Sequence, residues 1–478
     1  MSLTLTEHKL LKYSKVIPSD LSEDNEALHK ALLDDFSFLK DFKPRKFFKN
    51  QTASFLFSEN ENEYSIQADY LIGVDWLLPQ KRYVQVFPKL NQEISVVFDE
   101  LTDLDFDVEL PTFDQQIESR VFKSESNKQI EVDYLSMLMT IAGDSYFDPY
   151  LEDLFYIDYD SFPIQLNSKQ DSLTPLLVVR YLQLVKRIVQ KGLKKSYYKV
   201  QKNLKNKIKG KILVGQHIRN NIFKNRFTET YCEYQVFGEN NSENRFLKMV
   251  LRFVSTYIDE HQKLFHSSID ELKHTLHYIN PVFELVDLDF NIDGVKNLKY
   301  NPFYGEYKEA IKIGKLLLER FAYNITLAQN RDFVMTSPFW INMPALFEMY
   351  ICAIMRKANM NKLDTIKFQF STYGNALDIL ITDNQYSMVI DAKYKMHYQK
   401  GQIHDDIRQV SGYARLRKVR RALNISEDSD YIIDCLIIYP DMENGIENLT
   451  FENINQYKQA IPAYHKVWKL GVKLPFIG

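Results

Sequence analysis

Apolar and polar positions near residue 380 predict a β-hairpin that follows a helix. Two apolar runs, residues 376–381 and 386–394, are separated by four residues that include Asp383 and Asn384, which favour a turn. Upstream, apolar residues recur at the i, i+3, i+4, i+7 spacing of one buried helix face: Phe347, Tyr350, Ile351 and Ile354. The pattern therefore indicates a helix packed beside two half-buried strands.

The same three elements carry charged residues among their apolar positions. Asp378 lies in the first strand, Asp391 and Lys393 share one face of the second, and Glu348 lies beside the helix stripe. Because bare charge is costly to bury, these groups must be hydrated, paired or metal-bound. We expect Asp378, Asp391 and Glu348 to bind Mg²⁺ for phosphodiester hydrolysis, with Glu348 binding directly or through water, and Lys393 to position the attacking water.

The rest of the chain divides by pattern into two further regions. Residues 1–165 contain short aromatic and β-branched runs typical of strands, at 52–57, 70–78 and 82–90. Residues 166–330 are predicted to contain a helix ending at Gly192, basic strands around Gly210, and helices after 241 and after 302. Beyond the hairpin, the pattern predicts a helix at 405–424 and strands at 430–440 and 467–478, which would complete a mixed sheet.

Length and composition agree with a large globular protein. A chain of 478 residues is long enough for about three domains, and its 45% hydrophobic content supplies a large core. No apolar run approaches the roughly 18 residues that a membrane span needs. The three cysteines, Cys232, Cys352 and Cys435, are too few and too far apart for a disulfide framework, a zinc site or an iron–sulfur cluster. We therefore expect a cytoplasmic protein without a membrane segment.

Charge is distributed unevenly, although the net charge is only −3. Residues 172–228 contain 15 Lys and Arg and no acidic residue, whereas residues 1–171 contain 16 basic against 32 acidic residues. Lysines of the basic block are candidates to contact DNA phosphates or an acidic partner, with a solvated face as the alternative: Lys205, Lys207, Lys209 and Lys211. Cations of the 405–424 helix are candidate phosphate anchors, with the same alternative: Arg408, Arg415, Arg417, Lys418, Arg420 and Arg421.

The ordered set of Glu348, Asp378 and Asp391-Ala392-Lys393 resembles the core of the PD-(D/E)xK nucleases. Leu377 stands where that family has its proline. Gln409 and Tyr413 are similar to the QxxxY helix of RecB-like members, which implies that they hold the DNA backbone or the metal-bound water. The alternative is an α/β core whose strand ends happen to be acidic.

Residues 170–440 resemble the McrC family, through segments such as "GKILVGQHIRNNIFKNRF", "NPFYGEYKEAIKIGKLLL" and "FWINMPALFEMY". The resemblance implies the endonuclease subunit of a modification-dependent restriction system of the 5-methylcytosine type, which defends a cell against phage DNA. It also implies a partner, an AAA+ GTPase ring of the McrB type, which binds the GTP, reads modified double-stranded DNA and is stimulated by this chain. The sequence has no G-x-x-x-x-G-K-[ST] phosphate loop of its own.

We therefore expect an α+β multidomain protein. Its predicted parts are a β-rich, partner-docking N-terminal domain at 1–165, a basic strand and helical middle domain at 166–330, and a PD-(D/E)xK nuclease domain at 331–478. Two alternatives remain open: a stand-alone RecB-like DNA-repair nuclease, and a non-catalytic adaptor of a ring NTPase. The intact set of acids and lysine disfavours the adaptor, because a binding module has no need of charges on core strands.

Overall fold

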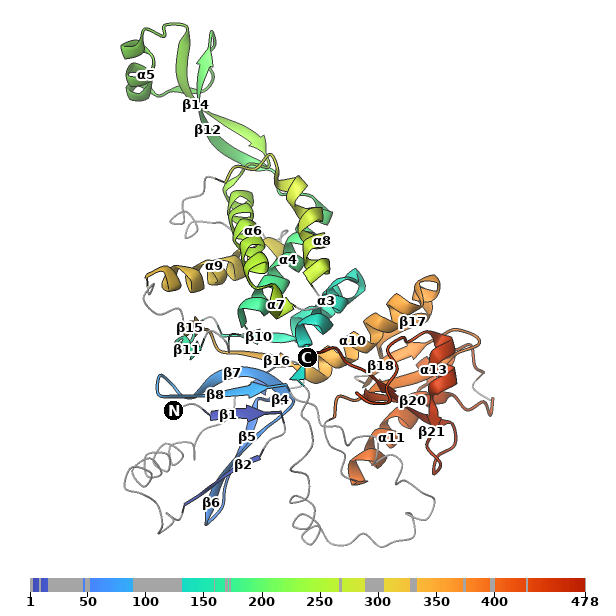
Figure 1. Ribbon diagram of the computed structural model, residues 1–478. Helices are drawn as coiled ribbons and strands as arrows, with labels where there is room; N and C mark the ends of the chain where they lie inside the picture. Colours follow the sequence, from blue (N-terminus) through green and yellow to red (C-terminus); the bar gives the residue numbers. More distant parts are fainter. Residues whose placement is uncertain are drawn as a thin grey trace. The chain divides into compact units, whose positions relative to one another are not determined.

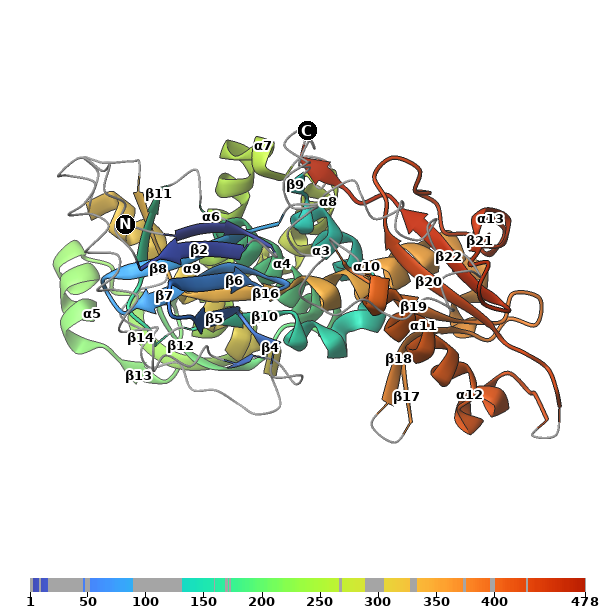
Figure 2. The ribbon, with the colours of Figure 1, turned by 90° about the horizontal axis from the view of Figure 1, so that it is seen from below.

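The computed structural model of the chain (Figures 1 and 2) describes residues 3–7, 10–15, 46–47, 52–88, 131–158, 160–167, 171, 173–265, 269–288, 305–326, 333–372, 375–395, 400–426 and 429–477. The chain forms two compact units. Unit 1 combines residues 1–164 with residues 337–478, and unit 2 consists of residues 165–336. The division into three domains stays a prediction.

The N-terminal segment of unit 1 is rich in strands, as predicted. A five-stranded sheet has the order β1 (Leu3–Thr6), β8 (Arg82–Phe87), β7 (Leu71–Leu78), β16 (Phe339–Asn342) and β10 (Phe155–Ile157). A second sheet has the order β2 (Leu10–Ser14), β6 (Glu63–Ala68) and β5 (Phe55–Glu59). Buried side chains of the two sheets share one core, which includes Leu5, Phe55, Ile66 and Trp340.

Strand β16 joins the C-terminal segment of unit 1 to the N-terminal sheet. It lies far from β7 in sequence and pairs with it antiparallel. The two strands approach each other closely at Gly73, where a Cβ atom would overlap the carbonyl of Phe339. Gly73 also has a φ of +151°, which other residues rarely adopt. Smaller elements of this unit are α3 (Tyr134–Ala142), η3 (Ser145–Asp153), and the pairs β3 (Lys46–Phe47) with β4 (Thr52–Ala53) and β9 (Glu131–Val132) with β23 (Phe476–Ile477).

The C-terminal segment of unit 1 contains a six-stranded mixed sheet. Its order is β17 (Ile366–Thr372), β18 (Asn375–Ile381), β19 (Met388–Ala392), β20 (Asp434–Pro440), β22 (Val467–Val472) and β21 (Gln459–Ala460). Strands β19, β20 and β22 are parallel, so their carboxyl ends lie at the same edge. The associated helices are α10 (Met343–Ala358), η9 (Met360–Thr365), α11 (Lys400–Ala414), α12 (Arg417–Ala422) and α13 (Phe451–Tyr457).

The hairpin and the helix of the sequence pattern are confirmed, with differences in extent. The second strand ends at Ala392 and not at 394, so Lys393 lies just beyond it, and the strand expected at 430–440 begins at Asp434. The second strand begins at Met388 and not at 386, because Asp383 accepts backbone hydrogen bonds from Gln385 and Tyr386 and so extends the turn. The helix expected at 405–424 is two helices, since Leu416 adopts an extended conformation between α11 and α12. The strand expected at 467–478 is also divided, into β22 and β23, which belong to different sheets.

Unit 2 is built on helices whose apolar faces pack together, as the sequence periodicity predicts. They are α4 (Leu173–Lys191), α6 (Ser242–Glu260), α7 (Gln262–Phe265), α8 (Ile269–Ile279), η7 (Asn280–Phe283) and α9 (Gly305–Thr326), and the short strands β11 (Ile164–Asn167) and β15 (Phe333–Thr336) pair beside them. A buried ion pair joins Arg320 to Asp171 at 2.6 Å. No helix in the described part of the chain has the length and apolar character to cross a membrane.

The predicted basic strands form a long hairpin of unit 2. Strand β12 (Ser196–Lys205) pairs antiparallel with β14 (Glu229–Gly238), and the segment between them contains β13 (Lys211–Ile212), α5 (Val214–Asn220) and η5 (Ile222–Lys224). Figure 1 shows this tip at the far end of the hairpin from the helices of the same unit. Buried Asn221 fastens the tip, because its side chain exchanges hydrogen bonds of 2.8 Å with Asn203.

Candidate active site

The predicted acids lie on neighbouring strands. Strands β18 and β19 are antiparallel with Ile379 opposite Ile390, so the register continued by one residue places Asp378 opposite Asp391. The backbone N–H of Ala392 donates to Asp378 Oδ2 at 2.7 Å. The hairpin therefore fixes two carboxyl groups side by side at the carboxyl end of β19.

Asp391 is fully buried, and its charge has one close counterion. The Lys393 ammonium lies 2.9 Å from Asp391 Oδ2, as expected for residues two apart on one strand face. Within the described part of the chain, the hydrogen-bonding side chains beside the Asp391 carboxylate are Lys393 and Asp378. A buried carboxylate that shares one lysine with a second carboxyl group is costly, so the arrangement favours a further cation.

Helix α11 adds the two other predicted residues. Lys393 Nζ donates to Gln409 Oε1 at 3.0 Å, and Gln409 Nε2 donates to the Tyr413 hydroxyl at 2.7 Å. Gln409 and Tyr413 lie one turn apart, so they share a face of the helix. The structure thus brings four of the predicted residues together, because contacts run from Asp391 through Lys393 and Gln409 to Tyr413.

Burial and nearby charges shift the pKa of each of the three carboxyl groups. Burial raises the pKa of Glu348 to about 7; Lys393 lowers it and Asp391 raises it further. Burial raises the pKa of Asp378 well above its usual value, and the charges of Glu348 and Asp391 add to that effect. Burial likewise raises the pKa of Asp391, against the lowering effect of Lys393. All three acids therefore lie close enough to repel one another.

Lys393 responds in the opposite sense. Burial by itself lowers the pKa of an ammonium group, but the carboxylates of Asp391 and Asp378 raise the pKa of Lys393 above its usual value. These two carboxylates therefore favour the charged form of Lys393. It can neutralise charge or hold a water molecule.

The donor set fits Mg²⁺ in its chemistry. Within the described residues, no three His, Cys, Asp or Glu side chains are already placed to hold a metal ion together. Mg²⁺ nevertheless keeps several waters and is usually bound through one or two carboxylates together with substrate phosphates, so a complete protein cage is not required. Asp391, with Asp378 or Glu348 beside it, offers the hard oxygen ligands that such an ion prefers.

The cations predicted on α11 and α12 have different surroundings. Arg415 and Arg417 are exposed. Arg408 is exposed and lies 3.3 Å from Asp405. Lys418 stacks over the ring of Phe370 at 4.7 Å, while Arg421 is also exposed. Arg420 differs, because its guanidinium donates to the carbonyls of Ser426, Ser429 and Tyr431 and so fastens the loop after α12.

The lysines of the basic block belong to unit 2. Lys205, Lys207, Lys209 and Lys211 are all exposed at the end of the β12–β14 hairpin, and the Lys209 ammonium lies 4.5 Å above the ring of Tyr234. Large apolar side chains are exposed on the same tip: Ile208, Val214, Ile222, Phe223 and Phe227. The tip therefore combines positive charge with exposed apolar area.

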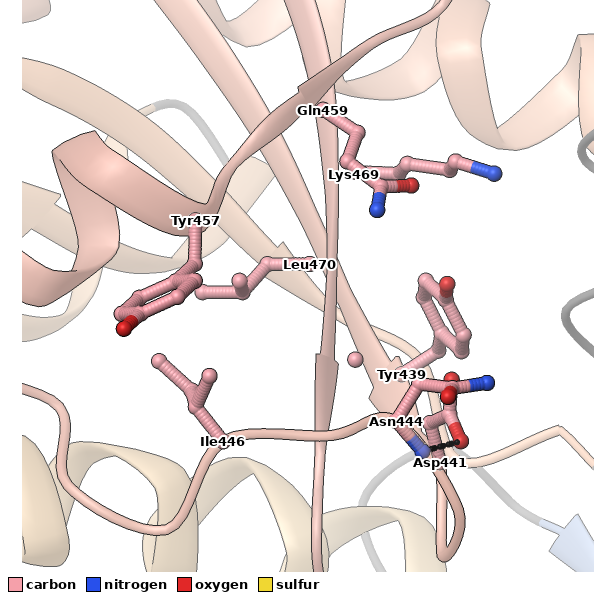
Figure 3. A pocket seen from close by; sticks show the side chains of 9 residues that line it. Tyr439, Asp441, Asn444, Ile446, Tyr457, Gln459, Lys469 and Leu470 are labelled. Atoms are coloured by element: carbon pink, nitrogen blue, oxygen red, sulfur yellow. Dashed lines mark hydrogen bonds between the residues drawn. The ribbon is translucent and has the colours of Figure 1, made fainter.

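A polar hollow lies two strands from Asp391 on the same sheet. It has a volume of about 180 Å³ and surrounds Gly471; its other lining residues are Tyr439, Asp441, Asn444, Ile446, Tyr457, Gln459, Lys469 and Leu470 (Figure 3). Asp441 closes the turn below it by accepting the backbone N–H of Asn444 at 2.9 Å. The hollow is separate from the acids, since the β20 residue Ile437 lies between Asp391 and Lys469 in the register.

Sequence reasoning missed the residues that surround the predicted set. Lys395 forms an ion pair of 2.6 Å with Asp406 of α11. Tyr394 is buried and donates its hydroxyl to Glu7 Oε2 at 3.1 Å. The sequence held a hint of the ion pair between Lys395 and Asp406, because Lys395 lies two residues after Lys393 and Asp406 lies three residues before Gln409. No sequence pattern indicated the hydrogen bond between Tyr394 and Glu7, since the two residues lie 387 positions apart.

Fold and site together define a mixed α/β protein with a cluster of coupled acids and a lysine at the edge of its C-terminal sheet. The family model described as "McrBC 5-methylcytosine restriction system component" matches residues 116–423. The match covers more than half of the chain. The chain therefore belongs to the family of McrBC 5-methylcytosine restriction system components, which confirms the family expected from the sequence.

Solved structures that are similar to this chain include the following two. One is described as a refined half-complex from a tetradecameric assembly of Thermococcus gammatolerans McrB AAA+ hexamers with bound McrC; the aligned chain has 15% identity, a TM-score of 0.35, and coverage of 100% of this chain and 95% of that chain. The other is a cryo-EM structure of the Thermococcus gammatolerans McrBC complex, with 16% identity, a TM-score of 0.28, and coverage of 89% and 99%. A comparison with curated proteins gives no match.

Proposed function

We propose that this chain is the Mg²⁺-dependent endonuclease subunit of a restriction system that acts on DNA with 5-methylcytosine-type modification. The family to which it belongs supports the restriction system. The observation that carries the nuclease assignment is the ion pair of Asp391 with Lys393, flanked by Asp378, at the carboxyl end of β19. In this proposal residues 331–478 are a PD-(D/E)xK core.

Each residue has a role that follows from its surroundings. Asp378 and Asp391 would hold Mg²⁺, with Glu348 bound to it directly or through water. The ion would stabilise the charge of the phosphoryl oxygens and lower the pKa of a bound water. Lys393 would hold the attacking water or neutralise charge on the phosphate. Gln409 orients the Lys393 side chain by accepting its 3.0 Å hydrogen bond, and it donates to the Tyr413 hydroxyl at 2.7 Å. Gln409 and Tyr413 would hold the DNA backbone or the metal-bound water.

The exposed cations beside the acids would hold the DNA backbone. Arg408, Arg415, Arg417, Lys418 and Arg421 can contact phosphates from α11 and α12, whereas Arg420 is engaged with its loop. Phosphate contacts position a protein on DNA but carry no direct sequence information. The choice of DNA must therefore come from elsewhere, which in this proposal is a partner.

The proposed partner is an AAA+ GTPase ring that binds GTP and is stimulated by this chain. The similar structures are of McrB AAA+ hexamers with bound McrC and of an McrBC complex. On this chain, the tip of the β12–β14 hairpin has the features of a protein-binding surface, because Phe223 and Phe227 are 79% and 75% exposed beside the four lysines. We therefore assign Lys205, Lys207, Lys209 and Lys211 to the partner in preference to DNA.

The experiment that tests this function compares methylated and unmethylated plasmid. The chain alone, with partner, and with partner and GTP is incubated with Mg²⁺ or with EDTA. We expect cleavage of the methylated plasmid in the complete mixture with Mg²⁺, and none in EDTA. Because one active site cuts one strand, a double-strand break requires two copies of the chain.

Two other outcomes would replace the proposal with one of its alternatives. Efficient linearisation of unmodified plasmid by the chain alone would identify a stand-alone DNA-repair nuclease. Stimulation of GTP hydrolysis without any cleavage, under all metal conditions, would identify a non-catalytic adaptor.

A further inference from the structure

The helix that carries Glu348 continues directly from a strand of the N-terminal sheet. Strand β16 ends at Asn342, and α10 begins at Met343 without an intervening loop. The backbone N–H of Met343 donates to the carbonyl of Tyr70 at 3.2 Å, and the Asn342 side chain caps the helix by accepting the N–H of Ala345. The N-terminal sheet of unit 1 therefore sets the start of the helix, and Glu348 follows in its second turn.

One aromatic residue adjoins both parts of the site. Tyr394 directly follows Lys393 just past the end of β19, in a tight turn in which the N–H of Lys395 donates to the carbonyl of Lys393 at 3.1 Å. Lys393 contacts Gln409 of α11, while the Tyr394 ring packs against Phe347 of α10, with a centroid distance of 5.7 Å. Phe347 is the residue before Glu348. The position of the Tyr394 ring is thus linked to the positions of Lys393 and Glu348.

Residues of the N-terminal segment hold that ring. The Tyr394 hydroxyl donates to Glu7 Oε2 at 3.1 Å, and the Tyr70 ring meets the Tyr394 ring edge-on at a centroid distance of 6.5 Å. Glu7 is 5% exposed, and its own backbone N–H donates to the carbonyl of Phe87. The acceptor is therefore fixed by the parallel pairing of β1 with β8.

We propose that Tyr394 is a positioning residue for the nuclease site, and that Glu7 of the N-terminal segment fixes its ring through the hydroxyl. The inference rests on the proposed nuclease function. In this arrangement the N-terminal sheet holds Glu348 through β16 and α10, and holds Lys393 through Tyr394. It is part of the active-site scaffold and not only a surface for a partner.

The test distinguishes a positioning role from a role in folding by removing one hydrogen-bonding group at a time. Tyr394→Phe keeps the ring and its packing but removes the donor, and Glu7→Leu removes the acceptor. We expect each variant to lower kcat for DNA cleavage about tenfold with an unchanged KM for DNA, because a small misplacement of reacting groups is enough for such a loss. The double variant should lose no more than either single variant, since both remove the same contact. Glu7→Gln retains an acceptor oxygen and should restore most of the rate.

Tyr181→Phe is the matched control, because that buried tyrosine also donates its hydroxyl, to the carbonyl of Leu247 at 2.8 Å, but within unit 2. Its kcat should equal that of the wild type. The thermal unfolding of every variant is recorded, and rates are compared at a temperature where all are folded. A Tyr394→Phe variant that is folded and cleaves at the wild-type rate, or an additive double variant, would overturn the inference while leaving the nuclease function intact. A wild-type chain that never cleaves would overturn both.

Discussion

The raised pKa of Glu348 predicts that this carboxyl group lowers the free energy of unfolding at neutral and alkaline pH. In the folded protein this carboxyl has a pKa of about 7, against 4.5 for an unperturbed glutamate, and the cause is burial together with the charge of Asp391. The folded state therefore binds the proton more tightly than the unfolded state does. By linkage, this group disfavours folding progressively as pH rises from about 4.5 through 7, and the penalty is complete at pH 8.

The magnitude follows from the two pKa values. A difference of about 2.5 units at about 1.4 kcal/mol per unit gives a penalty of about 3 kcal/mol at pH 8. The variant Glu348→Gln has the same shape and no charge. We therefore expect it to stabilise the folded protein by up to about 3 kcal/mol at pH 8 without divalent cations, and to have almost no effect at pH 4. The same variant should lose cleavage, because it removes a proposed ligand of the metal.

The assay is denaturant unfolding followed by tryptophan fluorescence. The chain has three tryptophans, Trp76, Trp340 and Trp468, and all of them lie in unit 1, so the signal reports the unit that contains Glu348. Glu443→Gln, a change at an exposed position of the same unit, is the matched control and should shift neither midpoint. A Glu348→Gln variant that is no more stable than the wild type at pH 8, or is stabilised equally at pH 4 and pH 8, would refute the argument.

Three further predictions concern other parts of the chain. Replacing Lys207 and Lys209 by Glu should abolish stimulation of the partner's GTP hydrolysis while leaving DNA affinity unchanged; loss of DNA binding instead would assign these lysines to DNA. Replacing Arg415 and Arg417 by Ala should reduce the slope of log affinity for DNA against log salt by about 0.9 per phosphate contact removed, and an unchanged slope would show a merely solvated face. Arg320→Leu leaves its buried aspartate partner unpaired, so unit 2 should lose about 3–5 kcal/mol of stability by circular dichroism; a loss below about 1 kcal/mol would contradict a buried ion pair.

Much of the C-terminal sheet could be predicted from local sequence. The helix with Glu348 and the hairpin with Asp378 and Asp391 follow from apolar spacing and turn residues, because these signals act over a few neighbouring positions. Once the hairpin is predicted, the closeness of the two aspartates follows from the pairing of its strands. The place of Gln409 and Tyr413 at the site was expected only through the family resemblance, since no local rule brings α11 to the end of β19. The hydrogen bond between Lys393 and Gln409 was not predicted.

Contacts between distant segments could not be predicted. Strand β16 pairs with β7 although the whole of unit 2 lies between them in sequence, and no periodicity states which strands become neighbours. The same limit applies to Glu7 and Tyr394, whose hydrogen bond joins residues 387 positions apart. The division of the 405–424 helix at Leu416 was also missed, because neither Pro nor Gly marks the break.

We propose that Asp391 holds the metal ion for DNA cleavage, and a comparison of two aspartate variants tests this role. Asp391→Asn removes the buried charge at the site, whereas Asp383→Asn removes a carboxylate at the other end of β18, where it pairs with Lys362 at 3.0 Å. Initial rates of plasmid cleavage are measured for both, with partner, GTP and Mg²⁺ present. The account predicts a loss of at least about hundredfold for Asp391→Asn, equivalent to about 3 kcal/mol of barrier, and a wild-type rate for Asp383→Asn. Cleavage by folded Asp391→Asn at the wild-type rate would contradict it.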